Sequence, residues 1–450
     1  MRITRIAIAA GAALTALGTL TAAVPATAGT VPTPAARAAC PTARPGQARC
    51  LTLYAPQVAV NRAIAEKAAG LRVPPGSTTP KGWGAKSIES AYKLPLTKGA
   101  GQTIGIVDAF STPHLASDLG VYRKEYGLPP CTTASGCLRI VNQQGKPSPL
   151  PKADPLGWGV EETLDVSMVS AACPLCKIVV VEGKSSTFAN LAAAENTAVR
   201  LGANVVSNSY GGRESGFSQA FAKAYDQPGH VIVASSGDNG YTAAQFPANL
   251  APVTTAGGTQ LAKAKNARGW TETVWNNNLG ASGSGCSAYV PKPAWQHDPH
   301  CPGRTAADVA AVANNVPLYD SSVPKRFGGP WLTVAGTSIA SPLIAGIYGL
   351  AGNAATVQPG NEYAHASALF DVTQGNNDWF NQAHGASCGY DYLCVAKKGY
   401  DAPTGPRWTG PGTRGPRARH RAPGWRSRGV HTSVAGQPLP TRQECPAVWP

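Results

Sequence analysis

The chain has 450 residues, of which 43% are hydrophobic, and a formal net charge of +15. This length and composition can support a substantial core, which excludes a fully disordered chain and allows one large domain or two ordinary ones. Eight arginines and a single acid lie from Pro406 onward. The positive charge is therefore concentrated outside the expected core, and we expect no nucleic-acid partner.

The first residues, "MRITRIAIAAGAALTALGTLTAAVPATAG", carry two arginines, a short apolar run and the small-residue pattern Ala26-Thr27-Ala28. This order predicts a secretory signal over residues 1–28 and a secreted, extracellular protein. A membrane anchor is the alternative, but the run is short for a bilayer span. We expect no membrane association after signal cleavage.

Residues 29–95 are rich in Ala, Pro and Gly, and one helix is expected at "APQVAVNRAIAEKAAGL". We interpret this region as a short pro-segment or an N-terminal arm. From "GQTIGIVDAF" onward, β-branched runs alternate with helical stretches. The expected strands are "TIGIVDAF", "KIVVVEG", "NVVSNSYG", "HVIVASSG" and "PVTTAGG", and the expected helices are "HLASDLGVYRKEYG", "TFANLAAAENTAVRLG" and "FSQAFAKAYDQ". The alternation predicts an α/β domain over residues 96–405, with a mostly parallel sheet and helices on its faces.

Residues 406–450 are rich in Arg and Pro and have no helix or strand periodicity. We expect a disordered tail there.

Most of the eleven cysteines form close sequence pairs, which after a secretory signal are most simply disulfides. The pairs are Cys40 with Cys50, Cys131 with Cys137, Cys173 with Cys176, Cys286 with Cys301, and Cys388 with Cys394; Cys445 is left over. The "CPLC" at 173–176 also allows redox chemistry or half of a zinc site, but no second C-x-x-C completes either.

Ser338 lies in "VAGTSIASPLIAGIYGLAG", where a Gly-Thr-Ser turn opens an apolar helix with Pro342 near its first turn. A helix N-terminus offers free backbone amides and a positive dipole end, which suit a nucleophilic serine. A plain N-cap serine is the commoner alternative. A nucleophile also needs a base, and none of the eight histidines lies in a histidine motif.

Two acids of "VEETLDVSMV" provide another base. Glu161 and Asp165 are four residues apart and share a helix face, where paired carboxyls can share one proton. Glu162 is a competing partner for Asp165, and a solvated acidic face is the ordinary alternative. Asp238 follows the strand in "VIVASSGDNG" and is either a turn residue or, when protonated, an oxyanion donor.

In this order, "EETLD", "SSGDNG" and "GTSIASP" resemble the signature of the sedolisins, serine-carboxyl peptidases with a subtilisin-like fold. The stretches "VVSNSYG", "GSGCSAYVPKPAWQ" and "AADVAAVAN" are also similar, so the resemblance runs from about residue 101 to 405. It implies that Ser338 is the nucleophile, Glu161 its base, Asp165 the carboxylate that orients Glu161, and Asp238 the oxyanion donor. It also implies an acid optimum, on the order of pH 3 to 5 by ordinary carboxyl pKa values.

The resemblance further implies one structural calcium ion, which suits oxygen ligands. Its ligands would come from "FDVTQG", which supplies Asp371 and Val372, and from "KKGYD", which supplies Lys397, Gly399 and Asp401. Lys397 stands where the family has a glycine, so only its backbone carbonyl could serve. Two ordinary loop aspartates are the alternative.

The expected protein is a secreted, monomeric endopeptidase that acts on polypeptides through an acyl-enzyme on Ser338. Two departures from the family pattern bear on this prediction: the pro-segment is short, and the tail replaces a glycine-rich domain end. For the tail we hypothesise a shifted reading frame or a degenerate terminus. A non-catalytic secreted scaffold and an anionic-polymer binder that uses the arginine tail are the alternative functions.

Overall fold

The computed structural model describes residues 37–54, 80–324, 330–378, 388 and 391–406. The signal segment 1–28, the helix expected within 55–71, Cys445 and the tail from residue 407 lie outside these ranges. In the described part of the chain, no helix is long and apolar enough to cross a membrane.

An eight-stranded sheet forms the centre of the fold, and every pairing in it is parallel except that of β12 with β13. The path runs β13 (Trp270–Val274), β12 (Val253–Lys263), β9 (Val231–Ser235), β7 (Val205–Asn208), β4 (Thr103–Ala109), β6 (Lys177–Gly183) and β5 (Leu138–Asn142), with β16 (Val309–Val312) beside β12. The predicted mostly parallel sheet is therefore confirmed. The five expected strand runs all contribute to it.

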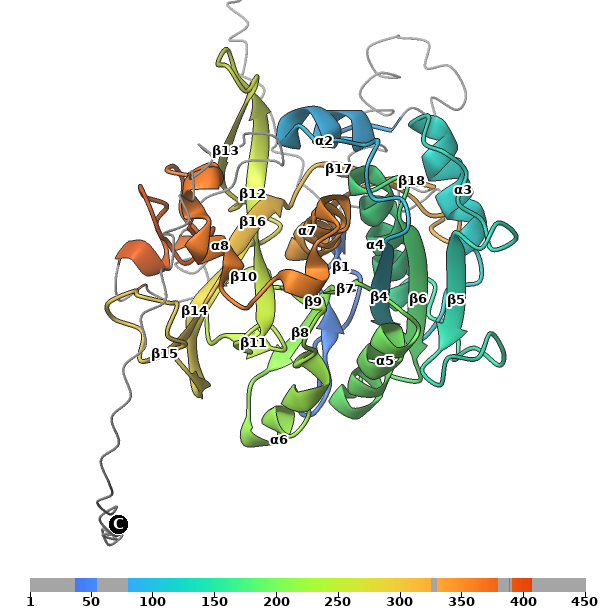
Figure 1. The fold of residues 1–450 in the computed structure, drawn as a ribbon, viewed down its shortest axis with the longest axis horizontal. Coiled ribbons are helices and arrows are strands. Elements are labelled where there is room, and N and C mark those ends of the chain that lie inside the picture. Colours follow the sequence, from blue (N-terminus) through green and yellow to red (C-terminus); the bar gives the residue numbers. More distant parts are fainter. Residues whose placement is uncertain (1–36, 55–79, 325–329, 379–387, 389–390, 407–450) are drawn as a thin grey trace, which may run out of the picture. The chain divides into compact units, whose positions relative to one another are not determined.

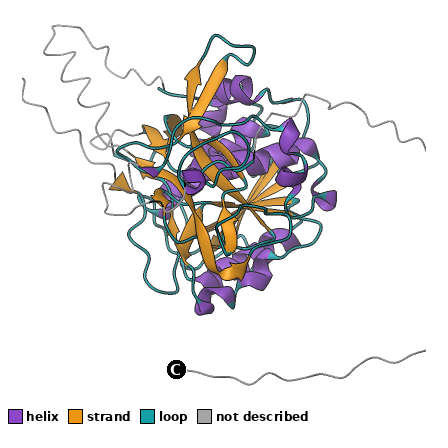
Figure 2. Ribbon diagram, turned by 90° about the vertical axis from the view of Figure 1, so that its left-hand side faces the viewer, coloured by secondary structure: helices purple, strands orange, loops and turns teal. Residues whose placement is uncertain are grey.

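Helices cover both faces of this sheet, as predicted, and they flank the strands in Figure 2. One face carries α2 (Ala85–Tyr92), α3 (Leu115–Glu125), α4 (Trp158–Ala172) and α7 (Thr337–Ala351), and the other carries α5 (Phe188–Arg200). Side chains alternate along each strand: Ile104 and Ile106 pack with α4 and α7, whereas Val107 packs with α5. The β-branched runs are buried on both faces for this reason.

Three smaller sheets surround the main one. They contain β1 (Arg37–Ala38), β3 (Leu53–Tyr54), β18 (Trp331–Ala335) and β17 (Val316–Tyr319); β10 (Asn239–Tyr241), β14 (Ala281–Pro291) and β15 (Gly303–Ala306); and β11 (Gln245–Phe246), β8 (Tyr210–Arg213) and β2 (Arg49–Cys50). The strand expected over 204–211 is thus divided at Ser209, because β8 leaves the main sheet to pair with β11 and β2. Residues 37–54 contribute β1, β2 and β3 to two of these sheets.

The helical stretch expected at 217–227 forms only short turns. The short helical elements are α6 (Gly216–Gln219), α8 (Asn361–Ala364), and the 3-10 turns η1 (Ala222–Tyr225), η3 (Ala354–Thr356), η4 (Ala366–Ala368) and η5 (Asp391–Leu393). A capping box at Ser215 begins α6, but 3-10 geometry replaces the α-helix within one turn.

The five predicted disulfides are confirmed: Cys40–Cys50, Cys131–Cys137, Cys173–Cys176, Cys286–Cys301 and Cys388–Cys394. The bridge between Cys173 and Cys176 lies immediately after α4, at the turn into β6. The bridge leaves no free thiolate for zinc, and both cysteines are fully buried, which favours a structural role over redox exchange.

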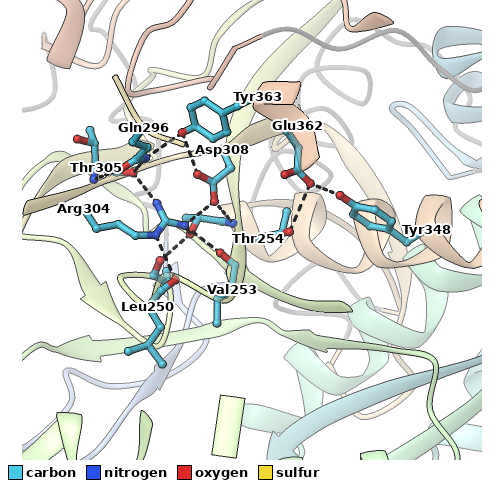
Figure 3. A network of polar contacts seen from close by, with 12 residues as sticks. Leu250, Val253, Thr254, Gln296, Arg304, Thr305, Asp308, Tyr348, Glu362 and Tyr363 are labelled. Carbon is cyan, nitrogen blue, oxygen red and sulfur yellow. Dashed lines mark hydrogen bonds and ion pairs between the residues drawn. The ribbon is translucent and has the colours of Figure 1, made fainter. Parts of the chain in front are cut away.

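A buried polar network fixes the C-terminal half of α7 (Figure 3). Arg304 is fully buried and pairs with Asp308 at 2.5 Å. Asp308 also accepts a hydrogen bond from Tyr363 at 3.0 Å. The neighbouring Glu362 accepts a hydrogen bond from Tyr348 of α7. Because a buried charge needs partners, this network constrains the helix that carries the candidate nucleophile in its first turn.

Candidate active site

The acids of "VEETLDVSMV" lie on α4, a helix in which every residue is buried. A helix that is apolar on nearly all sides belongs inside a protein, so its acids are carried into the interior. The side chains of Glu161 and Asp165 are both 0% exposed. The solvated acidic face is therefore excluded.

Glu161 receives its contacts from two distant parts of the chain. Its Oε2 accepts a hydrogen bond of 2.8 Å from the backbone N–H of Leu51. Burial raises the pKa of this carboxyl, while the nearby hydroxyls of Ser338 and Thr52 and the N–H of Leu51 oppose the rise. Glu161 thus lies beside the candidate nucleophile, as a base must.

Asp165 lies one turn further along α4. Its Oδ1 accepts a 2.7 Å hydrogen bond from the hydroxyl of Ser209, which also approaches the carbonyl oxygen of Ser338 at 3.3 Å. Burial raises the pKa of Asp165 well above its ordinary value, and the negative charges of Asp108 and Glu161 raise it further. We expect Asp165 to hold a proton when Glu161 is ionised.

Asp238 reaches the same centre from the turn after β9. Its Oδ1 accepts hydrogen bonds from the backbone N–H of Thr337 at 2.8 Å and from the Thr337 hydroxyl at 2.9 Å. Among the described residues, none donates a hydrogen bond to Oδ2. Burial raises the pKa of Asp238 to about 6, against the opposing hydrogen bonds from Thr337 and the positive charge of Arg49. Protonated Oδ2 would be a free donor within the site.

Ser338 is the second residue of α7, as the Gly-Thr-Ser turn predicts. Gly336 precedes the helix with φ 134°, a conformation that favours glycine. A Cβ on Gly336 would lie 2.0 Å from the carbonyl oxygen of Leu51. The turn therefore allows another backbone to approach the helix N-terminus closely. Pro342 is the sixth residue of α7, later than the sequence suggests, so its missing N–H leaves the Ser338 carbonyl without an intrahelical donor, and the Ser209 hydroxyl approaches this carbonyl instead.

The structure adds carboxyls that the sequence analysis did not place in the site. Asp108 is the penultimate residue of β4 and is directly opposite Glu182, the penultimate residue of β6, in the parallel register. Burial raises the pKa of Asp108 well above its ordinary value, and Glu161, Glu162 and Glu182 raise it further. Burial raises the pKa of Glu162 well above its ordinary value, and the charge of Glu182 adds more to this rise than the charge of Asp165 does. The only sequence signal was one acid at the carboxyl end of each of two adjacent buried strands.

The residues predicted to hold calcium come together away from Ser338. The backbone N–H of Gly399 donates to both carboxyl oxygens of Asp371 at 3.2 and 3.0 Å, and that of Lys397 donates to Asp401 at 3.2 Å. Val372 packs in an apolar cluster with Ala396. In the described ranges, no group of three or more His, Cys, Asp or Glu residues is arranged to hold a metal. A cation here would depend on two carboxylates and on backbone carbonyls.

The chain is similar to known proteases. Residues 158–367 match the subtilase family (peptidase S8). Sedolisin of Pseudomonas sp. (strain 101) is 29% identical over 204 residues, which are 38% of this chain and 33% of sedolisin. Xanthomonalisin of Xanthomonas sp. (strain T-22) is 31% identical over 169 residues, which are 32% of this chain and 20% of xanthomonalisin. The chain thus matches no more than a third of the length of these relatives.

A solved structure agrees in fold. Pseudomonas sedolisin, a serine-carboxyl proteinase complexed with two molecules of pseudo-iodotyrostatin, aligns with 74% of this chain and 96% of its own at 24% identity and a TM-score of 0.59. The parallel sheet flanked by helices, the serine at the start of α7, the buried carboxyls beside it and these similarities agree with one another. The chain is therefore similar to the sedolisins and to the wider subtilase family, and it has a subtilisin-like fold.

Proposed function

We propose that the chain is a secreted serine-carboxyl endopeptidase that hydrolyses polypeptides in acid through an acyl-enzyme on Ser338. The observation that carries the proposal is the position of Glu161, whose carboxyl has the Ser338 hydroxyl as a neighbour at the N-terminus of α7. A serine hydroxyl becomes a nucleophile when an adjacent base can take its proton. The five disulfides support an extracellular location.

The hydrogen-bond partners and neighbouring charges of Glu161 and Asp165 determine which of the two carboxyls is ionised. The N–H of Leu51 donates to Glu161, and the hydroxyls of Ser338 and Thr52 lie close enough to favour its ionised form, whereas Asp165 has one donor and two nearby negative charges. Glu161 therefore ionises before Asp165, which leaves one proton on the pair. In this state Glu161 can accept the proton of Ser338. Asp165 holds its own proton and limits the charge that the interior must bear.

The reaction follows from these roles. Ser338 Oγ attacks the substrate carbonyl carbon while its proton passes to Glu161. Protonated Asp238 donates to the oxygen that becomes negative, where a fixed buried donor is worth far more than a water molecule. As the C–N bond breaks, Glu161 returns the proton to the leaving amine. Water then hydrolyses the ester on Ser338 by the same proton path.

Hydrolysis of an unfolded polypeptide at acid pH tests this function. We expect wild-type protein to produce new amino termini, and Ser338→Ala to produce none above the uncatalysed rate. Equal hydrolysis by the two proteins would contradict the assignment. An inactive but folded wild-type protein would instead support the secreted, non-catalytic scaffold.

We also propose one structural calcium ion at Asp371 and Asp401, with backbone carbonyls of Val372, Lys397 and Gly399 as further ligands. Burial raises the pKa of Asp401 to about 7, and the nearby charge of Asp371 contributes to the rise. A divalent cation would relieve this repulsion between two carboxylates. The role of such an ion would be to hold the loop together, since it takes no part in the steps above.

A further inference from the structure

Residues 49–54 cross the active site between two strands that border it. Upstream, β2 pairs antiparallel with β8, with Arg49 opposite Gly211 and Cys50 opposite Tyr210. Downstream, β3 pairs antiparallel with β18, with Leu53 opposite Ala335 and Tyr54 opposite Val334. The strand β8 begins directly after Ser209, and β18 leads through Gly336 into α7. The segment is therefore held as an extended strand on both sides of Ser338.

The peptide bond between Leu51 and Thr52 lies between these two pairings, at the catalytic groups. The N–H of Leu51 contacts Glu161 Oε2 at 2.8 Å and the carbonyl oxygen of Ser209 at 3.3 Å. The hydroxyl of Thr52 lies beside the carboxyl of Glu161. Leu51 and Thr52 are 1% and 0% exposed, so they close the site to solvent.

The carbonyl oxygen of Leu51 also faces the proposed oxyanion donor. A Cβ on Gly336 would lie 2.0 Å from this oxygen and 3.1 Å from Asp238 Oδ2, the carboxyl oxygen that accepts no hydrogen bond from any described residue. Both oxygens therefore lie against the same side of Gly336. This is where a carbonyl must be if protonated Asp238 is to stabilise its negative charge.

The segment is preorganised by contacts within its own chain. The Cys40–Cys50 disulfide constrains the residue that precedes Leu51. The N–H of Ala39 donates to the carbonyl oxygen of Thr52 at 2.9 Å, and β1 pairs with β3. A strand that is already extended and cross-linked loses less conformational entropy on binding than a free peptide. Added-strand pairing also binds any extended peptide through its main chain.

We propose that residues 49–54 occupy the substrate channel as a substrate, that Leu51–Thr52 is a bond cleaved in cis, and that the site accepts an aliphatic residue before the cut. The inference rests on the proposed peptidase function. Ser338 Oγ forms an ester with the Leu51 carbonyl carbon while Glu161 takes the hydroxyl proton. The bond to the Thr52 nitrogen breaks, and this nitrogen receives the proton. Water then hydrolyses the ester, which leaves a Leu51 carboxylate and a free Thr52 amine.

The intact full chain tests the inference directly. Incubation in mild acid should convert the wild-type protein into a form with a new N-terminus at Thr52 and a fragment that ends at Leu51, both identified by mass spectrometry. The Ser338→Ala variant should keep the bond, with near-UV circular dichroism and the mass of the disulfide-bonded chain as controls for folding. The rate constant should not change on dilution, because the substrate is part of the same molecule. A rate proportional to protein concentration would overturn cleavage in cis.

Two peptides test the specificity of the channel independently of how the whole chain folds. One carries residues 47–54 with Cys50→Ser, and its matched control carries N-methylated leucine at position 51. The processed enzyme should cut the first between leucine and threonine. The control should react at least about tenfold more slowly, since it cannot donate to Glu161 and Ser209. Equal rates would overturn the assigned register.

These outcomes separate the inference from the proposed function. If the wild-type protein hydrolyses an unrelated unfolded polypeptide but leaves Leu51–Thr52 intact, the inference is wrong and the peptidase assignment stands. If it hydrolyses neither, both are wrong. Cleavage of Leu51–Thr52 at equal rates in wild type and Ser338→Ala would overturn the inference alone when an unrelated polypeptide still requires Ser338.

Discussion

Replacement of Asp238 by asparagine should extend activity toward neutral pH. The pKa of Asp238 is about 6, because burial disfavours its charged form. Only the protonated carboxyl can donate to the oxyanion, so the wild-type rate should fall as pH rises through 6. At pH 7 the protonated fraction is about one tenth. Asparagine keeps a neutral N–H donor and an oxygen to accept from Thr337, so Asp238→Asn should retain most of its own maximal kcat at pH 7.

The assay is the pH profile of kcat for a peptide substrate. The pKa of about 6 belongs to Asp238 in a site that residues 49–52 cover, as a bound peptide would cover it. Because kcat reports the pKa values of the enzyme–substrate complex, this pKa should appear in the pH profile of kcat rather than in that of kcat/KM. Asp238→Ala should have no compensating donor, and it should lower kcat by about 10²- to 10³-fold below pH 6, where the wild-type carboxyl is protonated; the difference from wild type should shrink as pH rises above 6.

Asp320→Asn is a matched control for Asp238→Asn. Asp320 is also buried, its pKa is raised to about 7, and one carboxyl oxygen accepts a backbone hydrogen bond while the other accepts none among the described residues. It does not contact the catalytic groups in any described hydrogen bond, so Asp320→Asn should leave the fall of kcat at alkaline pH as it is in the wild-type protein. An unchanged alkaline limb in Asp238→Asn would refute the assignment of Asp238 as the titrating oxyanion donor.

Three further predictions concern stability and geometry. The Cys173→Ser, Cys176→Ser double variant should lose more activity than thermal stability. A bridge between residues 3 apart in sequence removes little entropy from the unfolded chain, but it fixes the turn after α4. Equal losses in kcat and Tm would contradict this. Calcium in excess should raise Tm by mass action at pH 8, where Asp401 is ionised, and much less at pH 5. The Asp371→Asn variant should show no calcium-dependent shift in Tm at either pH. A calcium response that survives Asp371→Asn would exclude this site. The free energy of unfolding should be greatest in acid and fall between about pH 4.5 and 8, because buried Glu195, with its pKa raised to about 8, keeps a proton that the unfolded chain releases. Glu195→Gln should reduce that slope by about 1.4 kcal/mol per pH unit in urea titrations, and an unchanged slope would show that Glu195 ionises normally.

Much of the fold could be predicted from local sequence. β-branched runs at regular spacing identify β4, β6, β7, β9 and β12, because strands buried on both faces need continuous apolar side chains. The five disulfides follow from cysteine spacing in an exported chain. Stretch 217–227 was predicted wrongly as a helix, since its pattern carries no information on the tertiary contacts that end α6 after one turn.

From sequence alone, two site residues could be placed next to each other only where they lie in the same short motif. Glu161 and Asp165 share a helix turn, so their spacing alone places them together. Asp108 joins them through the register of β4 against β6, which no local pattern specifies. The same limit applies to Leu51, which meets Glu161 across 110 residues of sequence. Such contacts depend on strand pairing between distant segments.

The central claim is that Ser338 is a nucleophile activated by Glu161. An active-site-directed acylating probe tests it most directly, with the protein first incubated in mild acid and the label located by intact mass and peptide mapping. We predict one label per chain, on Ser338, in the wild-type protein, no label in Ser338→Ala, and strongly reduced labelling in Glu161→Gln, which cannot accept the proton. A wild-type protein that remains unlabelled at Ser338, or a Glu161→Gln variant that labels at the wild-type rate, would contradict the account.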